Sequence, residues 1–137
     1  MIRAEIPQED MYRWEDQAAQ YPLRGGPGVV YAPMTNVHVQ QRYPGSAPID
    51  CLLYYAPASR GPGYLVAILN HYPEDLPPFE KAGAVNVWVK PNQQGKGYAG
   101  LLWDEAVRRW DIDWRDSRYT PEGAARVAHR YGLEVEQ

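Results

Sequence analysis

The sequence is poor in cysteine and histidine, and each shortage excludes a class of site. Cys51 is the only cysteine among the 137 residues, so an internal disulfide cannot form, and we expect a reducing, cytoplasmic setting. His38, His71 and His129 are scattered along the chain and show no close ligand spacing. The sequence therefore predicts no metal site.

Long apolar runs and a surplus of positive charge are also missing. No apolar stretch approaches the roughly 20 residues that span a bilayer, and residues 1–17 lack the apolar core of a signal peptide. We therefore expect no membrane association. The formal net charge is −3, which argues against a nucleic-acid partner but leaves room for a local basic patch.

Apolar and aromatic residues, in contrast, are abundant. Hydrophobic residues make up 45% of the chain, which includes 5 Trp and 11 Tyr. At this length such material can build one core without disulfides or metal. We expect a single domain over residues 1–137.

Apolar periodicity predicts an alternation of helices and strands. Met11, Trp14, Ala18 and Tyr21 form one apolar stripe of a first helix. We expect helices over 8–21, 98–110 and 121–131, and strands over 29–34, 50–56, 64–72 and 84–89. Loops are expected over 35–48, with some extended pieces, and over the proline-rich stretch 73–83.

Three local signals refine this pattern. The turn at 59–63 predicts an antiparallel hairpin between the second and third strands. Thr120 and Pro121 predict the start of the last helix, and Gly132 predicts its end. The polar segment 111–117 is a candidate for a short strand, where the sheet is expected to be truncated. The order predicts an α+β fold whose sheet is mostly antiparallel and is flanked by helices.

A glycine-rich loop between the fourth strand and the next helix carries the main functional signal. Gly95, Gly97 and Gly100 satisfy G-x-G-x-x-G, but only 37 residues follow, too few for the further βαβ units of a dinucleotide fold. The phosphate-binding P-loop also fails, because Lys90 and Gly97 occupy positions that need Gly and Ser or Thr. Neither motif explains the loop.

The stretch 85–107 resembles the central motif of the GNAT superfamily, the Gcn5-related N-acetyltransferases. Gln94, Gly97 and Ala99 match its Q-x-x-G-x-A pattern, and Pro91 follows the strand as it often does in that family. A weaker match lies in the last helix, where Ala124 and Gly132 fit the family spacing. The resemblance implies a strongly twisted mixed sheet with flanking helices, and acetyl-CoA as cofactor.

The resemblance also implies where that cofactor binds. A helix N-terminus offers free N–H groups and a partial positive charge, and glycines let phosphate oxygens approach them. Backbone N–H groups would hold the pyrophosphate, Lys96 would add charge, and the pantetheine arm would pair with the strand edge near Val87–Val89. The residues implied in binding are Val87, Trp88, Val89, Gln94, Gly95, Lys96, Gly97, Tyr98, Ala99 and Gly100.

Acid and base residues are less clearly marked. Ala128 stands where many family members have the tyrosine that acts as general acid. Tyr119 and Tyr131 are the alternative candidates for the acid, and His71 and Glu80 are the candidates for the base.

The lead hypothesis is an N-acyltransferase that moves an acetyl group from acetyl-CoA to an amine of a small molecule or a protein. One alternative is a non-catalytic binding module with the same fold. Another is a nucleobase- or nucleotide-modifying enzyme. Its basic patch would come from Arg108, Arg109, Arg115 and Arg118. Whether the chain forms a homodimer is left open.

Overall fold

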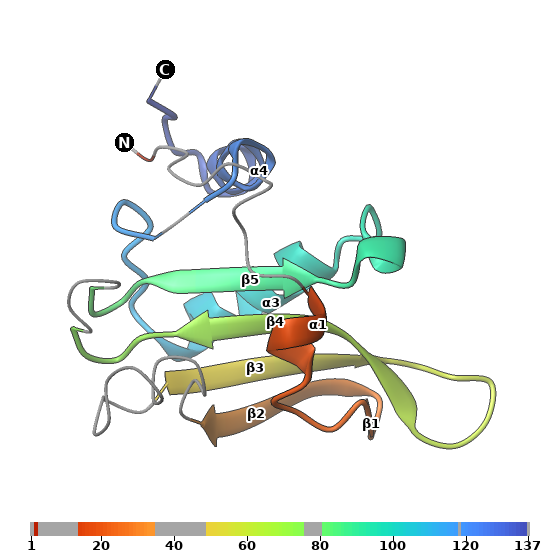
Figure 1. Ribbon diagram of the computed structural model, residues 1–137. Coiled ribbons are helices and arrows are strands. Elements are labelled where there is room, and N and C mark those ends of the chain that lie inside the picture. Colours follow the sequence, from red (N-terminus) through yellow and green to blue (C-terminus); the bar gives the residue numbers. More distant parts are fainter. Residues whose placement is uncertain (1, 3–13, 35–48, 76–80, 118, 137) are drawn as a thin grey trace.

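A computed structural model describes residues 2, 14–34, 49–75, 81–117 and 119–136 of the protein (Figure 1). Three α-helices and one short 3-10 helix accompany five strands in this part of the chain. The helices are α1 (Trp14–Ala18), η2 (Pro91–Gln93), α3 (Tyr98–Arg109) and α4 (Pro121–Tyr131). The strands are β1 (Arg24–Gly25), β2 (Gly28–Met34), β3 (Ile49–Ala56), β4 (Gly63–His71) and β5 (Val85–Val89).

The strands form one curled antiparallel sheet with β4 near its centre. One side of β4 pairs with β3, which in turn pairs with β2. The other side of β4 pairs first with β1, at Gly63 and Tyr64, and then with β5, from Ala67 to His71. The predicted hairpin between β3 and β4 and the predicted α+β class are confirmed.

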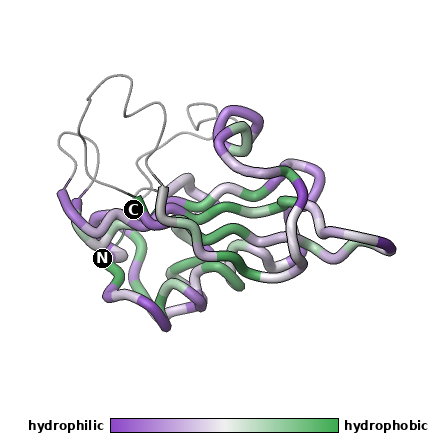
Figure 2. The backbone as a smooth tube through the Cα atoms, turned by 90° about the horizontal axis from the view of Figure 1, so that it is seen from below, coloured by the Kyte–Doolittle hydropathy of each residue, from purple (hydrophilic) through white to green (hydrophobic). Residues whose placement is uncertain are grey.

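The two faces of the sheet are covered by different helices (Figure 1). Side chains alternate along β3, so Leu53 faces the cluster that contains Trp14 of α1, whereas Leu52 faces the cluster that contains Leu102 of α3. Hydrophobic residues lie along the central strands, and hydrophilic ones gather in the turns (Figure 2). The sheet is thus buried on both faces.

Helix α4 lies beyond the β5 side of the sheet (Figure 1). Its ends are as predicted: Thr120 Oγ1 accepts from the Gly123 N–H at 3.2 Å, and Gly132 ends the helix with φ +67°. Ile2 is buried and forms a parallel bridge with Val135, just after this helix.

Two predicted elements differ from the structure. Residues 111–117 form no strand, and a turn occupies 114–117, where Asp113 Oδ1 accepts from the Asp116 N–H and so satisfies the backbone locally. The first helix ends at Ala18, three residues earlier than predicted, since the Tyr21 N–H bonds to the Ala18 carbonyl at 3.1 Å and tightens the last turn. The predicted loop 35–48, His38 and Met11 lie outside the described residues.

Candidate ligand cleft at the free edge of β5

Hydrogen bonds at the two ends of β5 determine which of its residues face β4. The Tyr72 N–H donates to the Ala84 carbonyl at 3.0 Å, and the Lys90 N–H donates to the Val66 carbonyl at 2.9 Å. Hydrogen-bonded and non-bonded pairs alternate in an antiparallel ladder. The even-numbered residues of β5 therefore direct their backbone groups toward β4.

The odd-numbered residues of β5 direct their backbone groups away from the sheet. The Val85 N–H donates to Ser117 Oγ at 2.9 Å, and the Val89 carbonyl accepts from Gln94 Nε2 at 3.3 Å. The N–H and carbonyl groups of Val87 and the N–H group of Val89 also face outward. These outward-facing backbone groups of β5 form a hydrogen-bonding edge for an extended ligand.

The segment after α3 covers only the first half of that edge. The Asp113 N–H donates to the Gly83 carbonyl at 2.9 Å, and Ser117 Oγ donates to the Asp113 carbonyl at 2.8 Å. Since Ser117 also receives the Val85 N–H, the edge is closed at Val85 and open from Val87 onward. The polar turns that replace the expected strand thus leave the gap.

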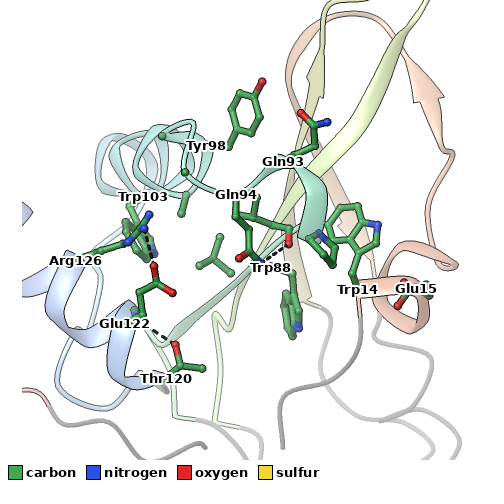
Figure 3. A pocket seen from close by; sticks show the side chains of 17 residues that line it. Trp14, Glu15, Trp88, Gln93, Gln94, Tyr98, Trp103, Thr120, Glu122 and Arg126 are labelled. Carbon is green, nitrogen blue, oxygen red and sulfur yellow. Dashed lines mark hydrogen bonds and ion pairs between the residues drawn. The ribbon is translucent and has the colours of Figure 1, made fainter. Parts of the chain in front are cut away.

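A cavity of about 350 Å³ occupies this gap (Figure 3). Its walls come from β5, the loop 91–97, the first turns of α3 and α4, and one turn of α1. Its volume lies in the range of small-molecule sites. Trp14, Trp88 and Trp103 supply aromatic surface, while the charged side chains in its lining are Glu15, Glu122 and Arg126.

One indole of the lining lacks a hydrogen-bond acceptor. Trp88 is only 8% exposed, and its Nε1 atom has no partner among the described residues. A buried donor without a partner is unfavourable, typically by about 1–3 kcal/mol. That Nε1 atom is shielded from solvent, so it is not a group that the open cavity presents to a ligand.

The glycine-rich loop leads into the cavity through the N-terminus of α3. Gly95 and Gly97 have φ +80° and +83°, a region that other residues rarely adopt, and no atom lies within 4 Å of a Cβ built on either. Gly97 caps the helix without any side-chain hydrogen bond. The first-turn N–H groups, including those of Tyr98 and Ala99, are therefore free of a side-chain cap.

Two residues of the predicted binding set have other roles in the fold. Lys96 Nζ donates to Gln93 Oε1 at 3.1 Å, and Lys96 does not line the cavity. Gly100 is buried, and a Cβ on it would lie 2.8 Å from Arg130 Nη1. The third glycine of the motif thus leaves room for the Arg130 guanidinium group, which pairs with Asp104 of α3.

The two candidate acids lie away from the cavity lining. Tyr119 is buried and donates its hydroxyl to the Trp114 carbonyl at 2.5 Å. Tyr131 donates to Asp104 Oδ1 at 2.8 Å and stacks on Trp114. Burial raises the pKa of both hydroxyls, so each phenol holds its proton more tightly than usual.

The candidate base His71 is also not among the residues that line the cavity. Its Nδ1 lies 3.1 Å from Asp50 Oδ2, and its ring stacks on Trp110 at 4.3 Å. Burial lowers the pKa of His71, an effect only partly opposed by Asp50. Glu80, the other candidate base, lies outside the described residues.

Sequence reasoning missed the part of the lining that α1 and α4 supply. Trp14 was assigned to the core and Thr120 only to a helix cap, and the cavity residues Glu15, Glu122 and Arg126 carry no motif. Each stands at a helix position that periodicity identifies, but only the packing of α1 and α4 around β5 brings them together. No local sequence pattern could have predicted that these residues lie together.

The arginines of the hypothetical basic patch are neutralised where they are described. Arg108 and Arg109 both pair with Glu105, and Arg115 pairs with Asp116 at 3.6 Å.

In the described ranges, no group of three or more His, Cys, Asp or Glu side chains is arranged to hold a metal ion. None of the helices found there has the length and apolar character to cross a bilayer.

Comparisons of the chain with protein-family models, curated proteins and solved structures gave no match. The resemblance to the GNAT superfamily therefore stays a prediction. The geometry of the cleft is the basis for the functional proposal that follows.

Proposed function

We propose that this protein is a GNAT-type N-acyltransferase that binds acetyl-CoA in the cleft beside β5. The observation that carries the proposal is the outward-facing backbone of Val87 and Val89. It opens on a cavity bordered by the glycine-rich N-terminus of α3. The pantetheine arm of acetyl-CoA is extended, contains amides and ends in a pyrophosphate. Its amides would lie along the β5 edge, and the pyrophosphate would reach the N-terminus of α3.

Two features of the cleft suit such a cofactor. The amides of a pantetheine arm are satisfied by the groups that β5 leaves outward, as in strand addition to a sheet edge. The phosphates are matched by the uncapped N–H groups at the start of α3, where Gly95 and Gly97 place no Cβ in the way.

When bound, acetyl-CoA supplies an acetyl group activated as a thioester. The chain itself would contribute position and polarisation: an outward N–H of β5, from Val87 or Val89, would donate to the reacting carbonyl. Amine acceptors are protonated at neutral pH, so a base is also needed. The lining holds two carboxylates, and since Glu122 pairs with Arg126, we assign this role to Glu15.

Calorimetric titration with acetyl-CoA tests the binding half of the proposal. Ala99 lines the cavity in the first turn of α3, where Ala99→Phe needs no unusual backbone angle. We expect wild-type protein to bind and Ala99→Phe to lose binding while staying folded. Val107→Ala, at an exposed position of the same helix, is the matched control and should bind normally. A folded wild-type protein with no heat of binding at millimolar acetyl-CoA would refute the proposal.

Thiol release from acetyl-CoA in the presence of an amine panel tests the catalytic half. Glu15→Gln should lower kcat and leave cofactor binding intact, because Glu15 acts on the acceptor rather than on the cofactor.

One observation favours a second function, a non-catalytic binding module: Tyr119 and Tyr131 are both engaged in internal hydrogen bonds. That function predicts binding of acetyl-CoA without thiol release for any amine.

A further inference from the structure

An ion pair lines the α4 wall of the cleft. Arg126 Nη2 lies 2.6 Å from Glu122 Oε1, one helical turn earlier on α4. Both residues belong to the cavity lining, and Figure 3 shows the contact between them as a dashed line. The position of the pair differs from that of an ordinary surface pair, because it borders a cavity.

Arg126 is the lone cation in the lining that the structure describes. The other charged lining residues are Glu15 and Glu122, so the lining is electrostatically unfavourable for an anion as it stands. Lys96 is directed to Gln93 and lies outside the lining. A phosphate-bearing ligand therefore meets a cation whose charge Glu122 already counters through one of its five N–H donors.

The pair is exposed enough for a ligand phosphate to replace Glu122 as the partner of Arg126. The side chains of Arg126 and Glu122 are 50% and 65% exposed, and ion pairs in water contribute little to stability. A guanidinium binds a carboxylate and a phosphate with the same fork of N–H donors, so one anion can replace the other. The exchange needs a rotamer change of two long side chains and no movement of the helix.

We infer that Glu122 holds Arg126 as an internal substitute for a ligand phosphate, and that Arg126 transfers to that phosphate when the cofactor binds. The inference rests on the proposed function and adds a specificity element to it. Glu122 competes with the ligand for Arg126, which lowers affinity for phosphate-bearing ligands but not for the phosphate-free arm.

The test compares three probes by calorimetry: CoA, dephospho-CoA and pantetheine. Arg126→Gln should weaken CoA about tenfold and leave pantetheine unchanged, since one charge-assisted contact is lost. Glu122→Gln should tighten CoA by up to about fivefold, since the competing surface pair is removed. Dephospho-CoA separates the two sources of phosphate: it follows CoA if the pyrophosphate is the partner, and pantetheine if the 3′-phosphate is.

Glu105→Gln is the matched control. Like Glu122→Gln, it removes one negative charge from a glutamate that pairs with arginine, but this glutamate lies on α3 and does not line the cavity. The affinity for CoA should therefore not change. CoA binding of equal strength in wild-type protein and Arg126→Gln would overturn the inference while leaving the proposed function intact. So would a Glu122→Gln variant that binds CoA no more tightly than wild type. Absence of binding for all three probes would overturn both.

Discussion

Arg130 of α4 lies directly over Gly100 of α3. A Cβ on Gly100 would meet three atoms of the Arg130 guanidinium group at 2.8–3.3 Å. The same guanidinium forms a two-point ion pair with Asp104, one turn further along α3, and Nε lies 2.9 Å from Oδ1. This contact links α4, which supplies one wall of the cleft, to α3.

A double-mutant cycle should reveal this contact. Gly100→Ala adds helix propensity of about 1 kcal/mol but pushes Arg130 away from Asp104. We expect a small net change in the free energy of unfolding in the wild-type background, and a gain of about 1 kcal/mol in an Arg130→Ala background. Urea unfolding of the four proteins measures both values. Equal effects of Gly100→Ala in the two backgrounds would show that the helices do not meet as described.

His71 should make stability depend on pH. Burial lowers its pKa from the usual 6.5, so the unfolded chain takes up a proton that the folded chain does not. Stability should therefore fall as pH drops below about 6.5, until the lowered pKa is passed. His71→Phe should lose that component of the slope, whereas His129→Gln, at an exposed position, should keep it. Urea unfolding between roughly pH 7.5 and pH 5 measures the slopes. A steeper slope in His71→Phe than in wild type would contradict the expectation.

Ser117 should be important for stability because it closes the first half of the β5 edge. Its hydroxyl receives the Val85 N–H and donates to the Asp113 carbonyl, and the side chain is 3% exposed. Ser117→Ala leaves a buried N–H unpaired and should cost about 1–3 kcal/mol in thermal or urea unfolding. Ser59→Ala, at an exposed turn, should change stability by less than about 0.5 kcal/mol. Similar costs at the two positions would argue against the role of Ser117.

Thr120 offers a milder test, since it caps α4 next to the cleft. Its Oγ1 accepts from the Gly123 N–H at 3.2 Å. Thr120→Ala should destabilise the protein by about 1 kcal/mol, and Thr120→Ser, which keeps the cap, by a few tenths. Thermal unfolding of the wild-type protein and the two variants measures both losses of stability. Equal losses would assign the effect to the threonine methyl group rather than to the cap.

Periodicity and turn chemistry predicted most of the described elements. The hairpin of β3 and β4 follows from two apolar runs around a glycine- and proline-containing turn, and the bounds of α4 follow from Thr120 and Gly132. Strand β1 was missed, because Arg24 and Gly25 pair with β4 only through tertiary contact. Segment 111–117 was assigned wrongly, since side-chain bonds from Asp113 and Ser117 stabilise turns there.

The site was only partly accessible to sequence reasoning. The loop motif identified Gly95, Gly97 and the edge at Val87 because these features are local. The opposite wall depends on how α4 packs, and its Arg126 belongs to no motif. Local pattern therefore predicted one side of the cleft and could not predict the other.

The most direct test of the central claim is amide hydrogen exchange of β5, resolved by NMR, with and without CoA. The N–H groups of Val87 and Val89 face the cleft, whereas those of Asn86 and Trp88 face β4. Without ligand, Val87 and Val89 should exchange faster than their even-numbered neighbours. Saturating CoA should slow Val87 and Val89 and leave Asn86 and Trp88 nearly unchanged. Unchanged exchange at Val87 and Val89 under saturating CoA would contradict the proposal that this edge holds the cofactor.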